Sequence, residues 1–276
     1  MNQGSDKRIR GRTTYSKQKE RKKGDAAMRF SELFQMLFSK SVFAIVLIIG
    51  LVCAMPVHAA TITVTNGDDS GAGSLRQAIA DAQSGDTIVF QDGVTTVTLT
   101  SDQLVIDKNL TIDGGGGMTV KRSSGVSTQF RIFYVDSGMT IEMKNIVISD
   151  GKALDASWST GEHGRHGGGI YVGNGGILTL NECSVKANAA GEGSHGSETT
   201  DGGDGGFGGG IYVENNGTLT LNNSTVSNNI SGNGGDGVKK TRGGPETTNG
   251  GDGGSGAGIY VEENGTLTLN NSIVND

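Results

Sequence analysis

Apolar and polar residues alternate in three short runs within the stretch 208–227. The runs cover 211–213, 218–221 and 225–227, and each places small aliphatic residues on alternate positions. A period of two is typical of strands with one buried face. Asn and Gly separate the runs, and both residue types accept the left-handed backbone of tight turns. The pattern predicts three very short strands joined by turns.

This unit is repeated along the chain. The phrase GGGIYVENNGTLTLNN at 208–223 returns as GAGIYVEENGTLTLNN at 256–271, and a looser copy, GGGIYVGNGGILTLNE, lies at 167–182. If each copy forms one turn of a coil, stacked turns pair their strands in parallel, about 4.8 Å apart. Such a β-solenoid buries an aliphatic column that one turn could not bury alone. We therefore expect Leu219 and Leu267 in one column.

The stretch GSLRQAIADAQSGD at 73–86 departs from this alternation. Its apolar residues recur at helical spacing, Ser74 is suited to the N-cap, and Gln77 stands where it would complete a capping box. Gly85 is suited to end the helix. We predict a helix over about 74–84 that covers the open first turn of the solenoid.

Gly-rich segments separate the copies. These inserts span 152–166, 189–207 and 230–255, and each precedes the first strand of a copy. Because the inserts leave the repeating unit at the same corner, stacking must place them beside one another. Inserts on one side of a solenoid often form its binding face.

The first 59 residues have a different composition. A long basic segment precedes the apolar run SVFAIVLIIGLVCAM at 41–55, and the sequence VHA follows. These features predict a basic leader with a secretory signal peptide over 1–59; an uncleaved N-terminal anchor is the alternative. Translation from Met28 instead of Met1 would give a leader of ordinary length.

Composition narrows the choice of architecture and partner. The chain has 48 Gly but 2 Pro, with 5% aromatic residues, so it cannot fill a broad core with large side chains. Its net charge is −6, and removal of the basic leader leaves a still more acidic remainder, which argues against nucleic acid as a partner. Cys183 alone remains beyond the leader, so no internal disulfide forms there; we interpret it as a small buried thiol.

Three phrases together resemble a known group of proteins. GSLRQAIADAQSGDTIVF, LVIDKNLTIDG and the GGGIYV…GTLTLNNSTVSNN copies are similar to bacterial right-handed parallel β-helix surface proteins, above all the polymorphic outer-membrane-protein-like group and its adhesin relatives. The resemblance implies an all-β, right-handed parallel β-helix over 60–276, with three short strands per turn and a short N-terminal capping helix. It also implies a secreted or outer-membrane surface protein in adhesion or a structural role, with an extracellular glycan or a surface protein as partner.

Tyrosines form the first candidate site. Each lies between two inward apolar residues of a first strand, so stacked turns should bring them together as an external ladder beside the inserts. Stacked rings stiffen a sheet, and they also form a platform for sugar rings. The candidate ligand-binding residues are Tyr134, Tyr171, Tyr212 and Tyr260.

Acidic and histidine side chains of the inserts form a second candidate site. GGDG segments at 202–205, 234–237 and 250–253 lack the final Asp of a calcium-binding nonapeptide, yet irregular oxygen sites also bind Ca²⁺. Histidines in neighbouring inserts are candidates for capture of a metal. The residues are Asp201, Asp204, Asp236, Asp252, His163, His166 and His195.

Catalysis by a polysaccharide lyase or a glycoside hydrolase is the alternative function. Hydrolysis needs paired carboxylates on one groove, and elimination needs a base with a cation or metal. The nearest acids, Asp107, Asp113, Asp136 and Asp150, lie in turns, and no column pairs them with Arg or Lys, so we assign no catalytic residue.

The last residues raise a question of assembly. The sequence stops directly after a predicted strand, and an open solenoid end invites pairing. We expect either a portion of a longer protein or end-to-end self-association. Membrane contact would come only through the leader or a missing C-terminal region.

Overall fold

A computed structural model of the chain describes residues 59–238 and 247–276. The predicted signal peptide over 1–59 lies almost wholly outside the described residues. In the described part the protein is nearly all β, with parallel sheets and a single helix, as expected for a solenoid-like chain.

The strands are short, apart from two long ones near the start. They are β1 (Thr61–Val64), β2 (Thr87–Phe90), β3 (Thr96–Leu99), β4 (Leu104–Ile106), β5 (Leu110–Arg122), β6 (Phe133–Val135), β7 (Thr140–Ser149), β8 (Ile170–Val172), β9 (Ile177–Asn181), β10 (Ser184–Lys186), β11 (Ile211–Val213), β12 (Thr218–Asn222), β13 (Thr225–Ser227), β14 (Ile259–Val261), β15 (Thr266–Asn270) and β16 (Ile273–Asn275). Each of the three quoted copies thus begins a set of three strands: β8–β10, β11–β13 and β14–β16.

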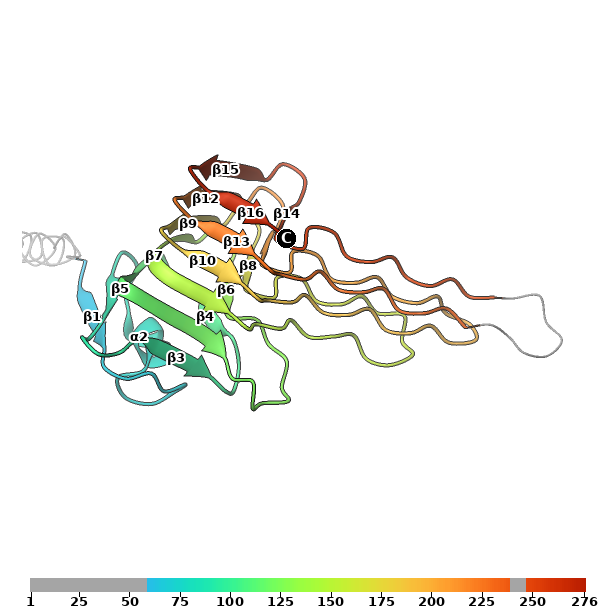
Figure 1. Cartoon of the computed structure of the whole chain (residues 1–276), viewed down its shortest axis with the longest axis horizontal. Coiled ribbons are helices and arrows are strands. Elements are labelled where there is room, and N and C mark those ends of the chain that lie inside the picture. Colours follow the sequence, from blue (N-terminus) through green and yellow to red (C-terminus); the bar gives the residue numbers. More distant parts are fainter. Residues whose placement is uncertain (1–58, 239–246) are drawn as a thin grey trace, which may run out of the picture. The chain divides into compact units, whose positions relative to one another are not determined.

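The strands form two sheets (Figure 1). The larger has 11 strands, with the path β1-β2-β5-β7-β10-β13-β16; β3 pairs with β5, and β9, β12 and β15 follow β7 in succession. The smaller has 5 strands in the order β14-β11-β8-β6-β4. All pairs are parallel, so every first strand stacks on first strands, as the repeated phrase predicts.

The register places like residues on like residues. Leu219 pairs with Leu178 on one side and Leu267 on the other, which confirms the predicted column. Inward positions of the inner strands are fully buried, whereas Leu267 in the last set is 41% exposed. Cys183 is buried as expected, and burial, as the main cause, raises the pKa of its thiol to about 11.

Turns between strands use left-handed residues where the sequence indicates them. Asn216 and Asn264 have φ of 59°, and Asn223 and Asn271 have φ of 48° and 50°. Both pairs occupy equivalent positions in successive copies. Asn tolerates this conformation better than other residues with a side chain, so the Asn-rich phrases fix where the strands end.

The helix α2 (Leu75–Asp81) ends before the predicted residue 84, because Ala82 already has an extended backbone. Its apolar face is buried, it contacts β1 and β4, and the Ser74 hydroxyl accepts the N–H of Gln77 as expected. The predicted reciprocal contact of the capping box is wrong. The Ser74 N–H instead donates to the Gly71 carbonyl, and the Gln77 amide donates to Asp81.

The inserts leave the sheets side by side, as predicted (Figure 1). A ladder of backbone hydrogen bonds runs through Arg165, Gly191, Gly206, Gly232 and Gly254: in each case the later N–H donates to the earlier carbonyl over 2.8 Å. Two of these bonds join neighbouring inserts, and the other two join the outgoing and returning arms of one insert. We call these packed segments the insert bundle. It is held by its backbone rather than by an apolar core.

Candidate functional site

The four tyrosines form one column on the smaller sheet. Tyr134, Tyr171, Tyr212 and Tyr260 are register partners, and successive ring centroids lie 5.2, 5.1 and 5.7 Å apart. The rings of each pair lie 4–27° from parallel. The column follows from the register of the strands, so its existence was predictable from the sequence.

Residues at the ends of inserts cover part of this column. His166 stacks on Tyr212 with centroids 4.5 Å apart, and Phe207 stacks on Tyr260 at 4.7 Å. Tyr212 is only 2% exposed. It therefore has no surface left for a sugar, whereas Tyr134, Tyr171 and Tyr260 remain partly exposed.

Two tyrosine hydroxyls are held by glutamates of the next copy. Tyr171 donates to Glu214 over 3.0 Å, and Tyr212 donates to Glu262. Burial, followed by these carboxylates, raises the pKa of both tyrosines above the ordinary value. The position equivalent to these glutamates, from which a side chain could accept the hydroxyl of Tyr134, is Gly173. The hydroxyl of Tyr134 has no hydrogen bond to any described residue.

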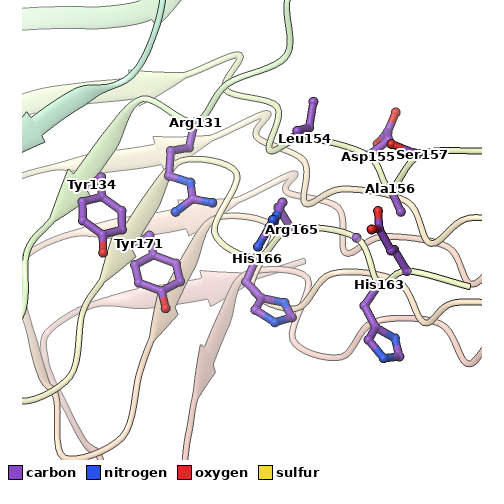
Figure 2. A pocket seen from close by; sticks show the side chains of 12 residues that line it. Arg131, Tyr134, Leu154, Asp155, Ala156, Ser157, His163, Arg165, His166 and Tyr171 are labelled. Atoms are coloured by element: carbon purple, nitrogen blue, oxygen red, sulfur yellow. The ribbon is translucent and has the colours of Figure 1, made fainter. Parts of the chain in front are cut away.

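A cleft opens at this end of the tyrosine column. Its volume is about 740 Å³. Figure 2 shows the lining side chains, which come from the strands β6 and β8, the segment before β6 and the first insert. The lining residues are Arg131, Tyr134, Leu154, Asp155, Ala156, Ser157, Glu162, His163, Gly164, Arg165, His166 and Tyr171.

Arg131 covers Tyr171 in the way that His166 covers Tyr212 and Phe207 covers Tyr260. Its guanidinium carbon lies 4.8 Å from the Tyr171 centroid and 5.7 Å from that of Tyr134, within cation–π range. Burial lowers the pKa of Arg131, and the charge of Arg165 acts in the same direction. Within the described residues, neither arginine side chain forms an ion pair or a hydrogen bond.

Sequence reasoning missed both arginines, although a signal for Arg131 exists. The residue three before the tyrosine is Gly168, Gly209 or Ala257 in the three quoted copies, but it is Arg131 before Tyr134 of β6. A side chain at Gly168 or Gly209 would collide with the carbonyl of Ala189 or Ile230 in the adjacent insert. The departure from the repeat therefore marks where the insert bundle ends and the cleft begins.

The predicted histidine ligands have another partner each. The Nδ1 of His163 accepts the N–H of Asp204, that of His195 accepts the N–H of Asp236, and that of His166 accepts the N–H of Phe207. The distances are 2.9, 3.1 and 2.9 Å. Each histidine thus joins one insert to the next.

Two of the predicted calcium ligands bind backbone in the same way. The carboxylate of Asp201 accepts the N–H of Asn249, and that of Asp204 accepts the N–H of Asp252, both over 2.7 Å. In residues 59–238 and 247–276, no three His, Cys, Asp or Glu side chains are grouped to hold a metal ion. Asp201 and Asp204 lie in the second insert, and Asp236 and Asp252 lie in the third.

The four turn acids considered for catalysis bind locally. Asp107 pairs with Lys108, Asp113 accepts the N–H of Gly115, Asp136 that of Ser137, and Asp150 accepts the hydroxyl of Ser149. Among the described residues, no hydrogen bond joins one of these acids to another.

Comparison with protein-family models and with curated proteins gives no match for this chain. Within the residues that the structure describes, none of the helical segments has the length and apolar character needed to cross a membrane.

The covering histidine predicts a pH dependence of stability. Burial lowers the pKa of His166; Arg131, His163 and Arg165 act in the same direction, and Glu262 opposes them. Below about pH 6.5 the His166 imidazole therefore binds a proton more readily in the unfolded chain than in the folded protein. The free energy of unfolding consequently falls as the pH drops. In His166→Gln, whose amide oxygen still accepts the Phe207 N–H, this loss should be smaller.

Urea unfolding at about pH 7 and pH 5 measures the effect. Equal losses of unfolding free energy in the native protein and in His166→Gln would contradict the assignment.

Proposed function

We propose that residues 60–276 form a right-handed parallel β-helix with three short strands per turn and a capping helix. The parallel pairing of all strands and the three-strand sets support this architecture. A structure of the purified protein determined by experiment tests the winding: a left-handed coil would contradict it.

The same proposal makes the protein an exported surface protein that attaches to an extracellular glycan or surface protein. The basic and apolar leader supports export, and the resemblance to bacterial β-helix adhesins supports attachment. The observation that carries the binding role is the cleft at the end of the tyrosine column. The cleft lies where Arg131 replaces the Gly or Ala of the later strand sets, and a regular scaffold does not need this replacement for its stability.

The insert bundle supports this role mechanically. Its segments are tied to one another by backbone hydrogen bonds over 2.8–3.0 Å, so the wall that carries His163 and Arg165 is braced. A braced wall loses little conformational freedom on binding, which favours affinity.

Binding of the full chain to an array of glycans and surface proteins, with and without calcium, tests the proposal. We expect at least one ligand whose binding Tyr134→Ala weakens. A polysaccharide-degradation assay runs in parallel, because release of unsaturated sugars would establish the lyase alternative instead. Absence of binding to every array member would overturn the proposed function.

A further inference from the structure

Two guanidinium groups in the cleft are available to an anion. No ion pair or hydrogen bond to a described residue engages Arg131 or Arg165, and Arg165 is exposed. No buried side-chain nitrogen or oxygen in the described part lacks a partner, so the unbonded nitrogens of Arg131 must reach solvent. The two guanidinium groups line one cavity; burial is the main cause that lowers the pKa of Arg131, and the charge of Arg165 acts in the same direction.

The acidic residues of the cleft do not neutralise these charges. The carboxylate of Asp155 is bound by Lys152 at 3.2 Å, by the amide of Gln129, and by the N–H of Glu192 at 2.8 Å. Glu162 is exposed and forms no ion pair with either arginine among the described contacts. Asp102 lines the adjoining cleft and its charge acts on Arg131, but it forms no ion pair or hydrogen bond with either arginine among the described contacts. An incoming anion would therefore meet two guanidinium groups that no carboxylate binds directly.

An aromatic ring with a free hydroxyl lies beside the two cations. Tyr134 is the last ring of the column: Tyr171 stacks on one side, and the register partner on the other side is Val105, which is 46% exposed. Its hydroxyl, unlike those of Tyr171 and Tyr212, has no glutamate partner. An aromatic face with a polar end is suited to a sugar ring, which is apolar on its face and polar at its edge.

We propose that this cleft binds a carboxylated sugar of an acidic polysaccharide, with its carboxylate on Arg131 and Arg165 and its ring against Tyr134. This inference rests on the proposed binding function and adds the chemical class of the ligand. The planar fork of an arginine matches the two oxygens of a carboxylate. An adjoining cleft of about 270 Å³ shares Arg131, Leu154 and Arg165, so neighbouring sugars of the same chain have room to continue.

Calorimetric titration of the full chain with a galacturonic acid trimer tests the charge. The matched probe is the same trimer with methyl-esterified carboxyls, which keeps the rings and removes the charge. We expect the acid to bind and the ester to bind at least about tenfold more weakly, because charge-assisted hydrogen bonds are lost.

Variants then locate the site. Arg131→Gln and Arg165→Gln should each weaken binding of the acid about 10- to 100-fold. Arg131→Lys should recover only part of the loss, since it restores charge without the fork. Lys186→Gln is the control, because Lys186 is an exposed cation at the end of β10, outside the cleft. Thermal unfolding of each variant verifies the fold, and Arg165 is exposed enough for its replacement to be tolerated.

The outcomes separate this inference from the proposed function. Equal affinity for acid and ester, or unchanged affinity in both arginine variants, overturns the carboxylate assignment. If the array yields a neutral ligand that depends on Tyr134 and the acid trimer does not bind, the binding function stands and the inference fails. If neither the array nor the trimer binds, both fail. Loss of acid binding in Lys186→Gln would also contradict the location.

Discussion

Replacing Leu219 by alanine should lower the free energy of unfolding by about 2–5 kcal/mol. Leu219 is 0% exposed and lies between Leu178 and Leu267 in a continuous aliphatic column. The turns above and below are fixed by backbone pairing, so they cannot move inward to fill the cavity. The cost therefore includes both lost burial and the cavity itself.

Leu267→Ala is the matched control, since it makes the same chemical change in the same column. Leu267 is 41% exposed in the described part, so its truncation leaves no enclosed cavity and should cost less than about 1 kcal/mol. Urea unfolding of the two variants measures the difference. Equal losses would show that the last strands are buried in solution, as end-to-end association would require, and size-exclusion chromatography would then detect the larger species.

The pairing of strands β8–β16 was largely predictable because three sets of strands carry nearly the same phrase. A period of two assigns the buried face of each strand, and repetition assigns its neighbours, so the pairing of Leu219 with Leu267 and of Tyr212 with Tyr260 needed no knowledge of long-range contacts. The Asn residues at turn positions reinforced this by fixing the strand ends. Local and global signals agree throughout the strands, which is the condition for reliable inference from sequence.

The functional surface was predictable only in part. The tyrosine column follows from register, but the exposure of each ring depends on what the inserts place over it. His166 covers Tyr212, while Arg131 stands over Tyr171 and leaves Tyr134 at the edge of a cleft. Because Arg131 and Arg165 lie in different segments, only folding shows that they line one cavity.

The candidate metal ligands show a different limit. Asp and His in Gly-rich segments are compatible with metal binding, yet here Asp204 and His163 accept N–H groups of the neighbouring insert. Backbone without a sheet on either side needs such partners for its polar groups. That need arises from packing between inserts, which the local sequence does not show.

Replacing Gly232 by alanine should disrupt the insert bundle. The N–H of Gly232 donates to Gly206, and its carbonyl accepts from Gly254, both over 2.8 Å. A Cβ at this position would collide with the carbonyl oxygen of Gly191, which is backbone and cannot rotate away. The neighbouring insert must shift, so we expect a loss of about 3 kcal/mol in the stability of the bundle.

Gly253→Ala provides the control within the same bundle, because a Cβ there would meet nothing within 4 Å. Its effect should stay within about 1 kcal/mol. Amide hydrogen exchange measures both variants: in Gly232→Ala the amides of Gly206 and Gly254 should exchange faster, while those of the strands β11–β13 keep their protection. If the strand amides of Gly232→Ala lose as much protection as the insert amides, the insert bundle and the sheets unfold as one unit. If the insert amides of Gly232→Ala exchange no faster than those of Gly253→Ala, close backbone contact does not hold the inserts together. Faster exchange at Gly206 and Gly254 would also imply that Gly232→Ala disturbs the cleft, because His163 and Arg165 keep their positions only while the inserts stay packed.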